Sequence, residues 1–378
     1  MRLAILGAGN IAGSMAKTVN AMEGVELYAI ASRSIDKANA FRTKWNVAKA
    51  YGSYDEMLAD DNVDLVYVAT PHSEHYTWTK AALNHGRNVL TEKAFTVNAN
   101  EAVELVALAK EKHKLLAEAI WTRYMPSRRI IDDAISRGVI GNVKSIIANL
   151  GYELSGKERL VRKKLAGGAL LDLGVYTINF ALMTAKSKVI RIAAEASLNE
   201  EGVDETNNIT LFFENGITAF LQSTMLSRTN RAGLILGDKG YMEILNINNC
   251  EGIRVYNNDG VLTETIEVPK CITGYEYEIM ACMKALESGD CECPDMPHAE
   301  TIRVMEIMDG VSRQFEEKNK LVCPVCRRHY FTAANSYEIC PVCKWENDAL
   351  QSAEPDYVGG ANNISLNEYR TKWRADNV

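Results

Sequence analysis

A short strand that leads at once into a glycine-rich turn opens the chain and restricts its fold more than any other feature. Residues 3–6 (Leu-Ala-Ile-Leu) precede Gly-Ala-Gly-Asn-Ile-Ala at residues 7–12, and a helical stretch follows. Gly7 permits the tight turn, Gly9 lets the backbone approach a pyrophosphate, and Ala12 permits close packing of helix on strand. Asn10 and Ile11 begin that helix, whose free N–H groups and positive dipole end favour phosphates. The pattern predicts a dinucleotide-binding site; a glycine turn without a ligand is the alternative.

The end of the second predicted strand, Val25–Ala31, indicates which dinucleotide is bound. An NAD-preferring site usually offers a carboxylate there to the ribose 2′-hydroxyl. Here Ser32, Arg33 and Ser34 follow the strand, and no carboxylate occurs before Asp36. A guanidinium and two hydroxyls suit a 2′-phosphate through charge-assisted hydrogen bonds. We therefore expect NADP(H) rather than NAD(H); a solvated Arg33 in a site that accepts both cofactors is the alternative.

Polar residues also follow the next two predicted strands. Val63–Ala69 leads into Thr-Pro-His-Ser-Glu-His at residues 70–75, and Asn88–Leu90 leads into Thr-Glu-Lys at residues 91–93. Strands that alternate with helices predict a parallel sheet, and such sheets bind ligands beyond their carboxyl ends. The candidate cofactor-binding residues at these ends are Thr70, Pro71, His75, Glu92 and Lys93. A surface charge is the alternative for Lys93, and a capping or surface role is the alternative for His75.

The residues after about position 120 predict a second domain that mixes helices and strands. The expected elements are helices at Pro126–Gly138, Gly168–Thr184, Tyr275–Glu287 and Pro297–Phe315, a strand at Asn142–Tyr152, and alternating strands from Asn208 to Val268. In the apolar helix, Asp172 and Tyr176 are four residues apart and therefore share one face. A carboxylate in such a helix must be paired, solvated or functional; a core tyrosine with a satisfied hydroxyl is the alternative for Tyr176.

These motifs resemble the Gfo/Idh/MocA family of oxidoreductases over about residues 1–318. The resemblance rests on the glycine turn, on Thr70-Pro71 with His75, on Glu92-Lys93, and on Gly-Gly-Ala-Leu-Leu-Asp-Leu-Gly-Val-Tyr at residues 167–176. The segment Trp121–Pro126 is similar to that of the dimeric dihydrodiol dehydrogenases and D-xylose dehydrogenases. Two positions depart from the family pattern. Ala94 replaces the proline of Glu-Lys-Pro, and Ala166 replaces the first residue of the glycine run.

The resemblance implies an α/β protein with an N-terminal doubly wound parallel Rossmann sheet and an α+β second domain. The second domain would have an open, mostly antiparallel sheet and form a homo-oligomer (dimer or tetramer). We expect the first two domains at residues 1–120 and 121–318. The implied function is a nicotinamide-dependent dehydrogenase acting on a secondary alcohol of a sugar, polyol or cyclic trans-diol. A non-catalytic sensor that binds nucleotide or sugar and signals through its C-terminal module is the alternative.

Hydride transfer from an alcohol requires a base for the hydroxyl proton, and the reverse reaction requires an acid. Tyrosine has an unperturbed pKa of about 10, and a nearby ammonium lowers that pKa. We expect Tyr176 to exchange the proton, Lys93 to tune it or orient the alcohol oxygen, and Asp172 to position the substrate. The rival assignment makes Lys93 the acid–base and Tyr176 a binding group.

Trp121 and Arg123 lie at the junction of the two expected domains, where clefts commonly form. By resemblance, Trp121 walls the substrate site and Arg123 reaches toward cofactor or substrate. His75 would contact nicotinamide or substrate. Plain packing between domains is the alternative for Trp121.

Two Cys-x-x-Cys pairs, Cys323/Cys326 and Cys340/Cys343, lie near the C-terminus. Such pairs can present four thiolates tetrahedrally to one zinc ion; free or disulfide-paired cysteines are the alternative. Residues 319–378 resemble the small cysteine-rich CPCC domain, with Val325 in place of the third cysteine of its first knuckle. We expect a zinc-ribbon-like module, in which the metal supplies folding energy that so small a core lacks.

Bulk composition narrows the partners of the chain. Its 378 residues carry a formal charge of −7, which argues against broad binding of nucleic acid or of an anionic membrane. The longest apolar stretch, Ala166–Ala185, is interrupted by Asp172 and Asn179, so we expect a buried helix. Five of the nine cysteines lie outside the two pairs without framework spacing, and no export signal is recognised; both favour the cytoplasm.

Overall fold

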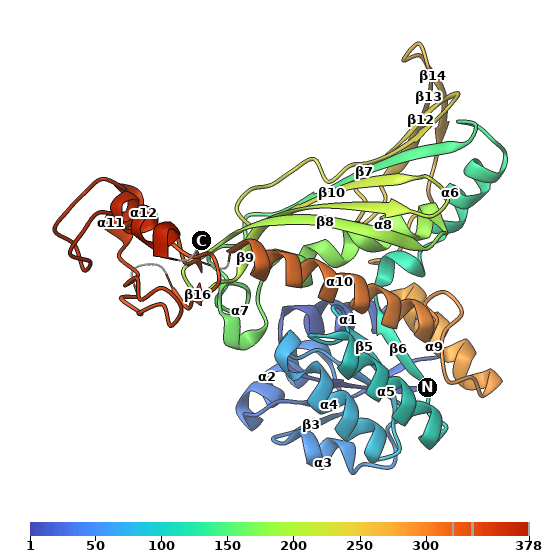
Figure 1. Ribbon diagram of the computed structural model, residues 1–378. Helices are drawn as coiled ribbons and strands as arrows, with labels where there is room; N and C mark the ends of the chain where they lie inside the picture. Colours follow the sequence, from blue (N-terminus) through green and yellow to red (C-terminus); the bar gives the residue numbers. More distant parts are fainter. Residues whose placement is uncertain (320, 334–335, 377–378) are drawn as a thin grey trace. The chain divides into compact units, whose positions relative to one another are not determined.

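The computed structural model describes residues 1–319, 321–333 and 336–376. They form two compact units, Met1–Val311 and Ser312–Val378. The first unit contains two large sheets, coloured blue to teal and green to ochre in Figure 1. The second unit contains a two-stranded sheet and two helices.

Six parallel strands form the first sheet, in the order β3-β2-β1-β4-β5-β6. They are β1 (Arg2–Leu6), β2 (Glu26–Ala31), β3 (Lys49–Tyr51), β4 (Leu65–Val68), β5 (Asn88–Glu92) and β6 (Leu116–Ala119). The connecting helices are α1 (Asn10–Val19), α2 (Ile35–Trp45), α3 (Tyr54–Leu58), α4 (His72–Asn84) and α5 (Ala99–Lys112). Residues 3–6 and 65–68 are fully buried, as expected for parallel strands covered on both faces. The strand order reverses between β1 and β4, the switch point where such sheets bind ligands.

Eight strands form the second sheet, in the order β14-β13-β12-β11-β7-β10-β9-β8. The strands are β7 (Val143–Gly151), β8 (Val189–Leu198), β9 (Asp204–Phe213), β10 (Thr218–Thr224), β11 (Gly233–Gly237), β12 (Gly240–Leu245), β13 (Gly252–Asn257) and β14 (Leu262–Ile266). Neighbouring strands run antiparallel except β7 and β10, which are parallel. The expectation of an open, mostly antiparallel sheet is therefore confirmed.

Helical segments accompany this sheet and complete the first unit. They are η1 (Trp121–Arg123), α6 (Pro126–Ser136), α7 (Glu158–Val161), η2 (Lys163–Leu165), η3 (Leu170–Gly174), α8 (Val175–Ala185), α9 (Glu276–Ser288) and α10 (His298–Asn319). Helix α8 packs on β7 and β10, and ten of its eleven residues are buried. The segment Lys163–Ala185 is long and apolar enough to cross a membrane, but 78% of its apolar window is buried inside the protein. The expectation of a buried helix is confirmed, although its first turn, Leu170–Gly174, is a π-helix.

One strand of the second sheet was not predicted, since the strands were expected to begin only at Asn208. Strand β8 and the first residues of β9 precede that position. The pairing of β8 with β9 shifts register between Val189 and Arg191 and again between Ser197 and Leu198. Such bulges break the alternation of inward and outward residues. The shifts confine regular alternation to residues 191–197, where the alternating apolar residues are Ile192, Ala194 and Ala196, and alanine is a weak strand signal.

The second unit has a small core. Strand β15 (Leu321–Val322) pairs antiparallel with β16 (Tyr330–Phe331), and the helices are α11 (Ala349–Ala353) and α12 (Leu366–Asp376). The buried core cluster consists of Cys323, Phe331, Cys340, Cys343, Trp345 and Leu366. Three of these six residues are cysteines, and the partly buried Cys326 packs against the cluster.

The glycine turn between β1 and α1 is pressed against the ends of two other strands. Gly7 has φ +108°, and its N–H donates to the Ala31 carbonyl oxygen at 3.0 Å. A Cβ built on Gly7 would lie 2.7 Å from the Ala69 carbonyl oxygen, whereas a Cβ on Gly9 meets no atom within 4 Å. Gly7 therefore serves the fold, and Gly9 faces open space.

Substitution of the two glycines separates these roles. We expect Gly7→Ala to lower the free energy of unfolding by about 1–3 kcal/mol, because both the positive φ and the close carbonyl disfavour a side chain. Gly9→Ala should change it by less than about 1 kcal/mol, since the added methyl meets no neighbour. Urea denaturation followed by circular dichroism measures both variants. Equal stability of the two variants would contradict this reading of the turn.

Candidate cofactor and active site

The carboxyl ends of β1, β2 and β4 offer groups that fit a phosphorylated dinucleotide. The Thr70 hydroxyl after β4 is buried and has no hydrogen-bond partner among the described residues, and the space above Gly9 is open. Arg33 is exposed after β2, beside the buried Ser32. The Ser34 hydroxyl instead accepts the Lys37 N–H at 3.4 Å and caps α2. The Ser32 hydroxyl in turn accepts the Ser34 backbone N–H at 3.5 Å. Thr70 and Arg33 therefore remain available to a cofactor, while both serine hydroxyls have a partner in the fold.

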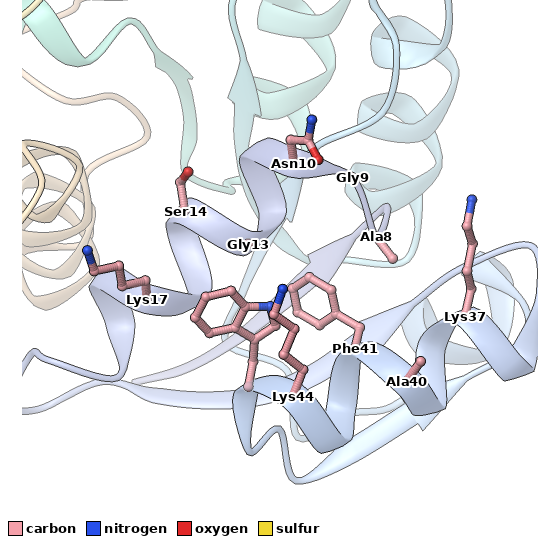
Figure 2. Close-up of a pocket in the computed structure, with 11 residues that line it drawn as sticks. Ala8, Gly9, Asn10, Gly13, Ser14, Lys17, Lys37, Ala40, Phe41 and Lys44 are labelled. Atoms are coloured by element: carbon pink, nitrogen blue, oxygen red, sulfur yellow. The ribbon is translucent and has the colours of Figure 1, made fainter.

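A groove of ≈ 450 Å³ extends from the glycine turn between α1 and α2. Figure 2 shows Lys17 of α1 and Lys37 and Lys44 of α2 around it, with the Phe41 ring between them and Asn10 at the start of α1. Lys37 lies in the first turn of α2, whereas Lys17 and Lys44 lie in the last turns of α1 and α2. The three ammonium groups add positive potential along the groove that leads from the N-terminus of α1, where phosphates bind. Lys37 was not among the residues predicted from the sequence.

Asp172 lies at the centre of a cluster of cationic side chains. The Lys93 Nζ is 3.3 Å from the Asp172 Oδ1 and donates to the Asp172 carbonyl oxygen at 2.8 Å. The Arg159 Nη1 donates to the same Oδ1 at 3.1 Å, and the His72 Nε2 lies 3.9 Å away. Burial raises the pKa of Asp172, but the charges of Lys93 and Arg159 outweigh it and hold the pKa below 3.8. Asp172 is therefore an anion at neutral pH.

Lys93 is held in place from its own strand end. Glu92, the last residue of β5, accepts the Lys93 N–H at 3.1 Å through Oε2 and the Tyr67 hydroxyl through Oε1. The peptide bond between Lys93 and Ala94 is cis. Burial raises the pKa of the Glu92 carboxyl. The strand end therefore directs Lys93 toward Asp172, as the predicted grouping of these residues required.

Tyr176 shares this cluster, but its electrostatics differ from the prediction. The Lys93 Nζ lies 5.0 Å from the centre of the Tyr176 ring, over its face. Burial, followed by the interactions with the neighbouring acidic groups Tyr275, Glu92 and Asp172, raises the pKa of Tyr176 well above 10. The expected lowering by Lys93 is wrong, because the desolvated phenol sits among acidic groups. Tyr176 therefore carries its proton at neutral pH.

His75 has a structural place in the described chain. Its Nδ1 lies 2.8 Å from the Ala94 carbonyl oxygen and its Nε2 lies 3.0 Å from the Thr70 carbonyl oxygen. The ring is 1% exposed, and burial lowers its pKa to about 4. Both ring nitrogens thus face backbone carbonyls of the two strand ends. His75 joins those ends and is neither a surface residue nor the cap of α4.

Trp121 and Arg123 are both engaged within the first unit. The Trp121 indole stacks on Tyr275 at 4.3 Å and donates to the Asn248 Oδ1 at 3.1 Å. The Arg123 guanidinium donates to the Asn179 Oδ1 at 2.6 Å and to the Glu300 Oε2 at 3.0 Å. Arg123 is 7% exposed. Its contacts tie η1 to α8 and α10, so the structure gives it a packing role that the resemblance did not imply.

Sequence reasoning missed His72, Arg159 and Tyr275. The His72 Nδ1 donates to the Ala166 carbonyl oxygen at 3.0 Å, and burial lowers the pKa of His72 to about 3. His72 follows the strand predicted at Val63–Ala69, and this place beyond a strand end was the signal in the sequence that could have identified it as a site residue. Arg159 lies in the four-residue helix α7, which carries no motif, so no pattern of spacing could join it to Asp172.

The four cysteines of the second unit converge. The sulfurs of Cys323, Cys326, Cys340 and Cys343 all lie within 4.8 Å of one another. Cys323 and Cys343 are 3.4 Å apart at Sγ, and Cys326 and Cys340 are 3.6 Å apart. Thiolates bound tetrahedrally at about 2.3 Å from zinc are separated by roughly 3.8 Å. The cluster can therefore hold one metal ion, and no protein atom needs a large displacement.

Known proteins match both units. The model of the oxidoreductase family with NAD-binding Rossmann fold, Gfo/Idh/MocA, matches residues 1–120, and that of the Gfo/Idh/MocA C-terminal domain matches residues 129–243. Mouse trans-1,2-dihydrobenzene-1,2-diol dehydrogenase is 31% identical over 82% of this chain and 95% of its own length. The chain belongs to the Gfo/Idh/MocA oxidoreductase family. D-xylose 1-dehydrogenase (NADP(+)) of Hypocrea jecorina, 33% identical over 83% of this chain and 92% of its own, is a further relative.

Solved structures of the family share the fold of the first unit. A 3-ketoreductase from Actinomadura kijaniata, in complex with NADP and TDP-benzene, gives a TM-score of 0.76 at 26% identity, over 83% of this chain and 98% of its own. An aldose-aldose oxidoreductase from Caulobacter crescentus gives 0.75 at 21% identity, over 84% and 98%. Residues 321–375 match the cysteine-rich CPCC model. Both resemblances drawn from the sequence are confirmed.

A second buried carboxylate, Asp204, fixes the start of the helix that carries Asp172. Its Oδ2 accepts the Leu170 backbone N–H and the Asn207 side-chain N–H, each at 2.8 Å. Burial raises the pKa of Asp204 from 3.8 to about 7. The folded protein therefore binds a proton here that the unfolded chain releases near pH 4.

This proton makes stability fall as the pH rises. The contribution of Asp204 is fully present below about pH 4 and is lost between pH 4 and 7, by at most roughly 4 kcal/mol. We expect Asp204→Asn to flatten that part of the pH profile, because the amide keeps an accepting oxygen and cannot ionise. Urea denaturation at pH 4.5 and 7.5 measures the slope; Asp290→Asn, at an exposed position, should keep the wild-type slope. An unchanged slope in Asp204→Asn would contradict the assignment.

Proposed function

We propose that the chain is an NADP(H)-dependent dehydrogenase that acts on a secondary alcohol of a sugar, polyol or cyclic trans-diol. The observation that carries the proposal is the position of the Lys93 ammonium, 3.3 Å from the Asp172 carboxylate and 5.0 Å from the Tyr176 ring. These three groups lie beyond the carboxyl end of β5, beside the strand ends that fit the cofactor. A phenol beside an ammonium and a carboxylate can transfer a proton to or from the oxygen of a bound alcohol.

Each of the three residues has a role in this chemistry. The bound nicotinamide supplies the hydride acceptor or donor. Tyr176, which holds its proton at neutral pH, donates that proton to the oxygen of a carbonyl substrate and recovers it in the reverse direction. Lys93 orients the substrate oxygen with its N–H groups, and Asp172 fixes Lys93 and accepts a substrate hydroxyl.

The preference for NADP(H) follows from the groups after β2. Arg33 is exposed beside Ser32, and Lys37 lies one turn into α2 at the edge of the groove. A 2′-phosphate would be neutralised by both cations, whereas the 2′-hydroxyl of NAD(H) would meet no carboxylate. The NADP bound by the Actinomadura kijaniata 3-ketoreductase supports this preference. The dissociation constants for NADPH and NADH test this preference: we expect tighter binding of NADPH, and equal values would contradict it.

We also propose the division of the chain into domains 1–120, 121–318 and 319–378, in a cytoplasmic homo-oligomer. The two sheets of the first unit and its two family models support the first boundary.

Phe220 and Ile147 pair across β10 and β7 and are 49% and 38% exposed, and Ile190 on β8 is 62% exposed. This apolar surface of the second sheet suits a second copy of the chain, which sedimentation equilibrium tests.

Substitution of the two central residues tests the catalytic assignment. Reduction of NADP⁺ is followed by nicotinamide absorbance across aldoses, inositols, polyols and cyclic trans-diols, with NAD⁺ in parallel. We expect Tyr176→Phe and Lys93→Met each to lower kcat by about 10²–10⁴-fold with a small change in KM, because the proton-transfer group or its orientation is removed. Tyr241→Phe, which removes a phenol hydroxyl from the second sheet, serves as the control and should keep wild-type kcat.

Two outcomes would contradict parts of this assignment. A loss of only a few-fold in Tyr176→Phe would transfer the acid–base role to Lys93. Tight NADPH binding without turnover of any compound in the panel would favour the non-catalytic sensor. Loss of NADPH binding in Tyr176→Phe would indicate damage to the fold.

We further propose that the four cysteines of the second unit bind a structural zinc ion. Four protein ligands close the coordination shell, which is typical of structural rather than catalytic zinc. Cys323, Cys340 and Cys343 are buried in the core of the unit, and Cys326 is partly buried. Four unpaired thiols would leave that core with few apolar contacts, so metal binding and folding of the unit are coupled.

Metal removal should therefore unfold the second unit. We expect about one zinc per chain after removal of loosely bound ions, and Cys340→Ser should lose the metal and the protection of the Trp345 indole from solvent. Elemental analysis and tryptophan fluorescence measure the two effects. Cys271→Ser, at a cysteine outside the cluster, is the matched control. Less than about half an equivalent of zinc in the wild type would refute the assignment.

A further inference from the structure

A segment of the first unit that carries five basic residues is fastened to the proposed active site at both ends. We call this segment, residues 157–164, the basic rim; its cations are Lys157, Arg159, Arg162, Lys163 and Lys164. Near its start, the Arg159 Nη1 donates to the Asp172 Oδ1 at 3.1 Å. Just after its end, the Ala166 carbonyl oxygen lies 3.0 Å from the His72 Nδ1. The residues between these contacts must therefore stay near the site.

Chain geometry limits how far the rim can extend. Successive Cα atoms are about 3.8 Å apart, so Arg162 lies within about 11 Å of Arg159 and Lys164 within about 8 Å of Ala166. The turn Lys163–Leu165 also packs against α4, which begins with His72. A substrate whose alcohol lies at Lys93 and Asp172 therefore has these cations within the length of a small molecule.

The charge of the rim is not balanced by its own neighbours. A hollow of ≈ 550 Å³ is lined by Arg162, Lys163, Lys164 and Glu201. Glu201 forms an ion pair with Arg162 and accepts the Lys163 backbone N–H at 3.1 Å. The Lys163 and Lys164 side chains are exposed in the same hollow. Glu158, within the rim itself, offsets a further charge, so two carboxylates face the five cations of the rim and an excess of positive charge remains.

The Asp172 carboxylate does not account for this excess. Lys93 and Arg159 already bring two positive charges to its single negative charge. Arg159 is 45% exposed at its side chain, so its guanidinium spans from solvent to the buried carboxylate. The positive potential of these cations would not strengthen the binding of a neutral sugar. An anion would be attracted as it approaches and would accept charge-assisted hydrogen bonds.

We infer that the substrate carries an anionic group, a phosphate or a carboxylate, which the basic rim binds while its alcohol lies at Lys93 and Tyr176. This inference rests on the proposed function of the site and specifies its substrate class as anionic sugars or cyclitols. Arg159 is placed between the anion and Asp172. Lys163 and Lys164 supply the remaining charge from the hollow.

Three sugars with one ring test the inference: glucose, glucuronate and glucose 6-phosphate. We expect kcat/KM with NADP⁺ to be at least about tenfold higher for one of the two anions than for glucose, with an advantage that shrinks as salt is added. The better anion identifies the group as carboxylate or phosphate. Lys163→Glu/Lys164→Glu should raise KM for that anion about tenfold or more and leave glucose kinetics and the NADPH dissociation constant unchanged. The matched control, Lys188→Glu/Lys239→Glu, reverses two exposed charges elsewhere and should behave as wild type.

The outcomes separate this inference from the proposed function. Turnover of neutral sugars or diols without preference for an anion would overturn the inference and leave the proposed function intact. Weaker NADPH binding in the rim variant would also overturn it, because the rim would then bind the cofactor. Calorimetric titration of the NADPH-loaded protein with each anion gives a readout that needs no turnover. Binding that the rim variant abolishes, without turnover, would sustain the inference and refute the proposed function; no binding of either anion would overturn the inference.

Discussion

The buried carboxylate of Asp172 is the group on which the arrangement of the first unit depends. An unpaired carboxylate with this burial would be strongly disfavoured. Lys93 from the end of β5 and Arg159 from α7 neutralise it. These contacts connect the parallel sheet to the helix that carries Tyr176 and to the second sheet on which that helix packs. The groups proposed for proton transfer and substrate binding therefore also link the two sheets of the unit.

A consequence of this coupling is that the site has little conformational freedom before substrate arrives. Tyr67 and Glu92 hold the backbone of Lys93, and Asp204 holds the start of the π-turn. His75 joins the loops after β4 and β5. Each contact uses a buried polar group, and a buried polar group is costly to leave unpaired. Such a preorganised site loses less energy to reorientation when charge moves during the reaction.

The sequence was sufficient for the parallel sheet and the glycine turn, which depend on local patterns and on the rule that carboxyl ends of parallel strands share one edge. The grouping of Lys93 with Asp172 was expected from the family resemblance, because Asp172 lies in a helix of the second domain and not at a strand end. Arg159 was not predictable, because its contact with Asp172 depends on where the short helix α7 packs. The packing of Arg123 on Glu300 joins residues 177 positions apart, and the bulges of β8 confine its regular pairing to residues 191–197. Ionisation of Tyr176 was misjudged because burial is a property of the whole fold.

The raised pKa of Tyr176 decides which protonation state the free site holds at neutral pH. A phenol whose pKa lies well above 10 is almost wholly protonated there, although it is a weaker acid than an ordinary phenol. Carbonyl reduction begins with this protonated phenol, whereas alcohol oxidation needs its conjugate base. The charge of a bound ligand also changes the pKa of Tyr176: a cation near the phenol lowers this pKa, and an anionic substrate raises it. An anionic substrate therefore keeps Tyr176 protonated, and the cations of the basic rim offset part of that effect.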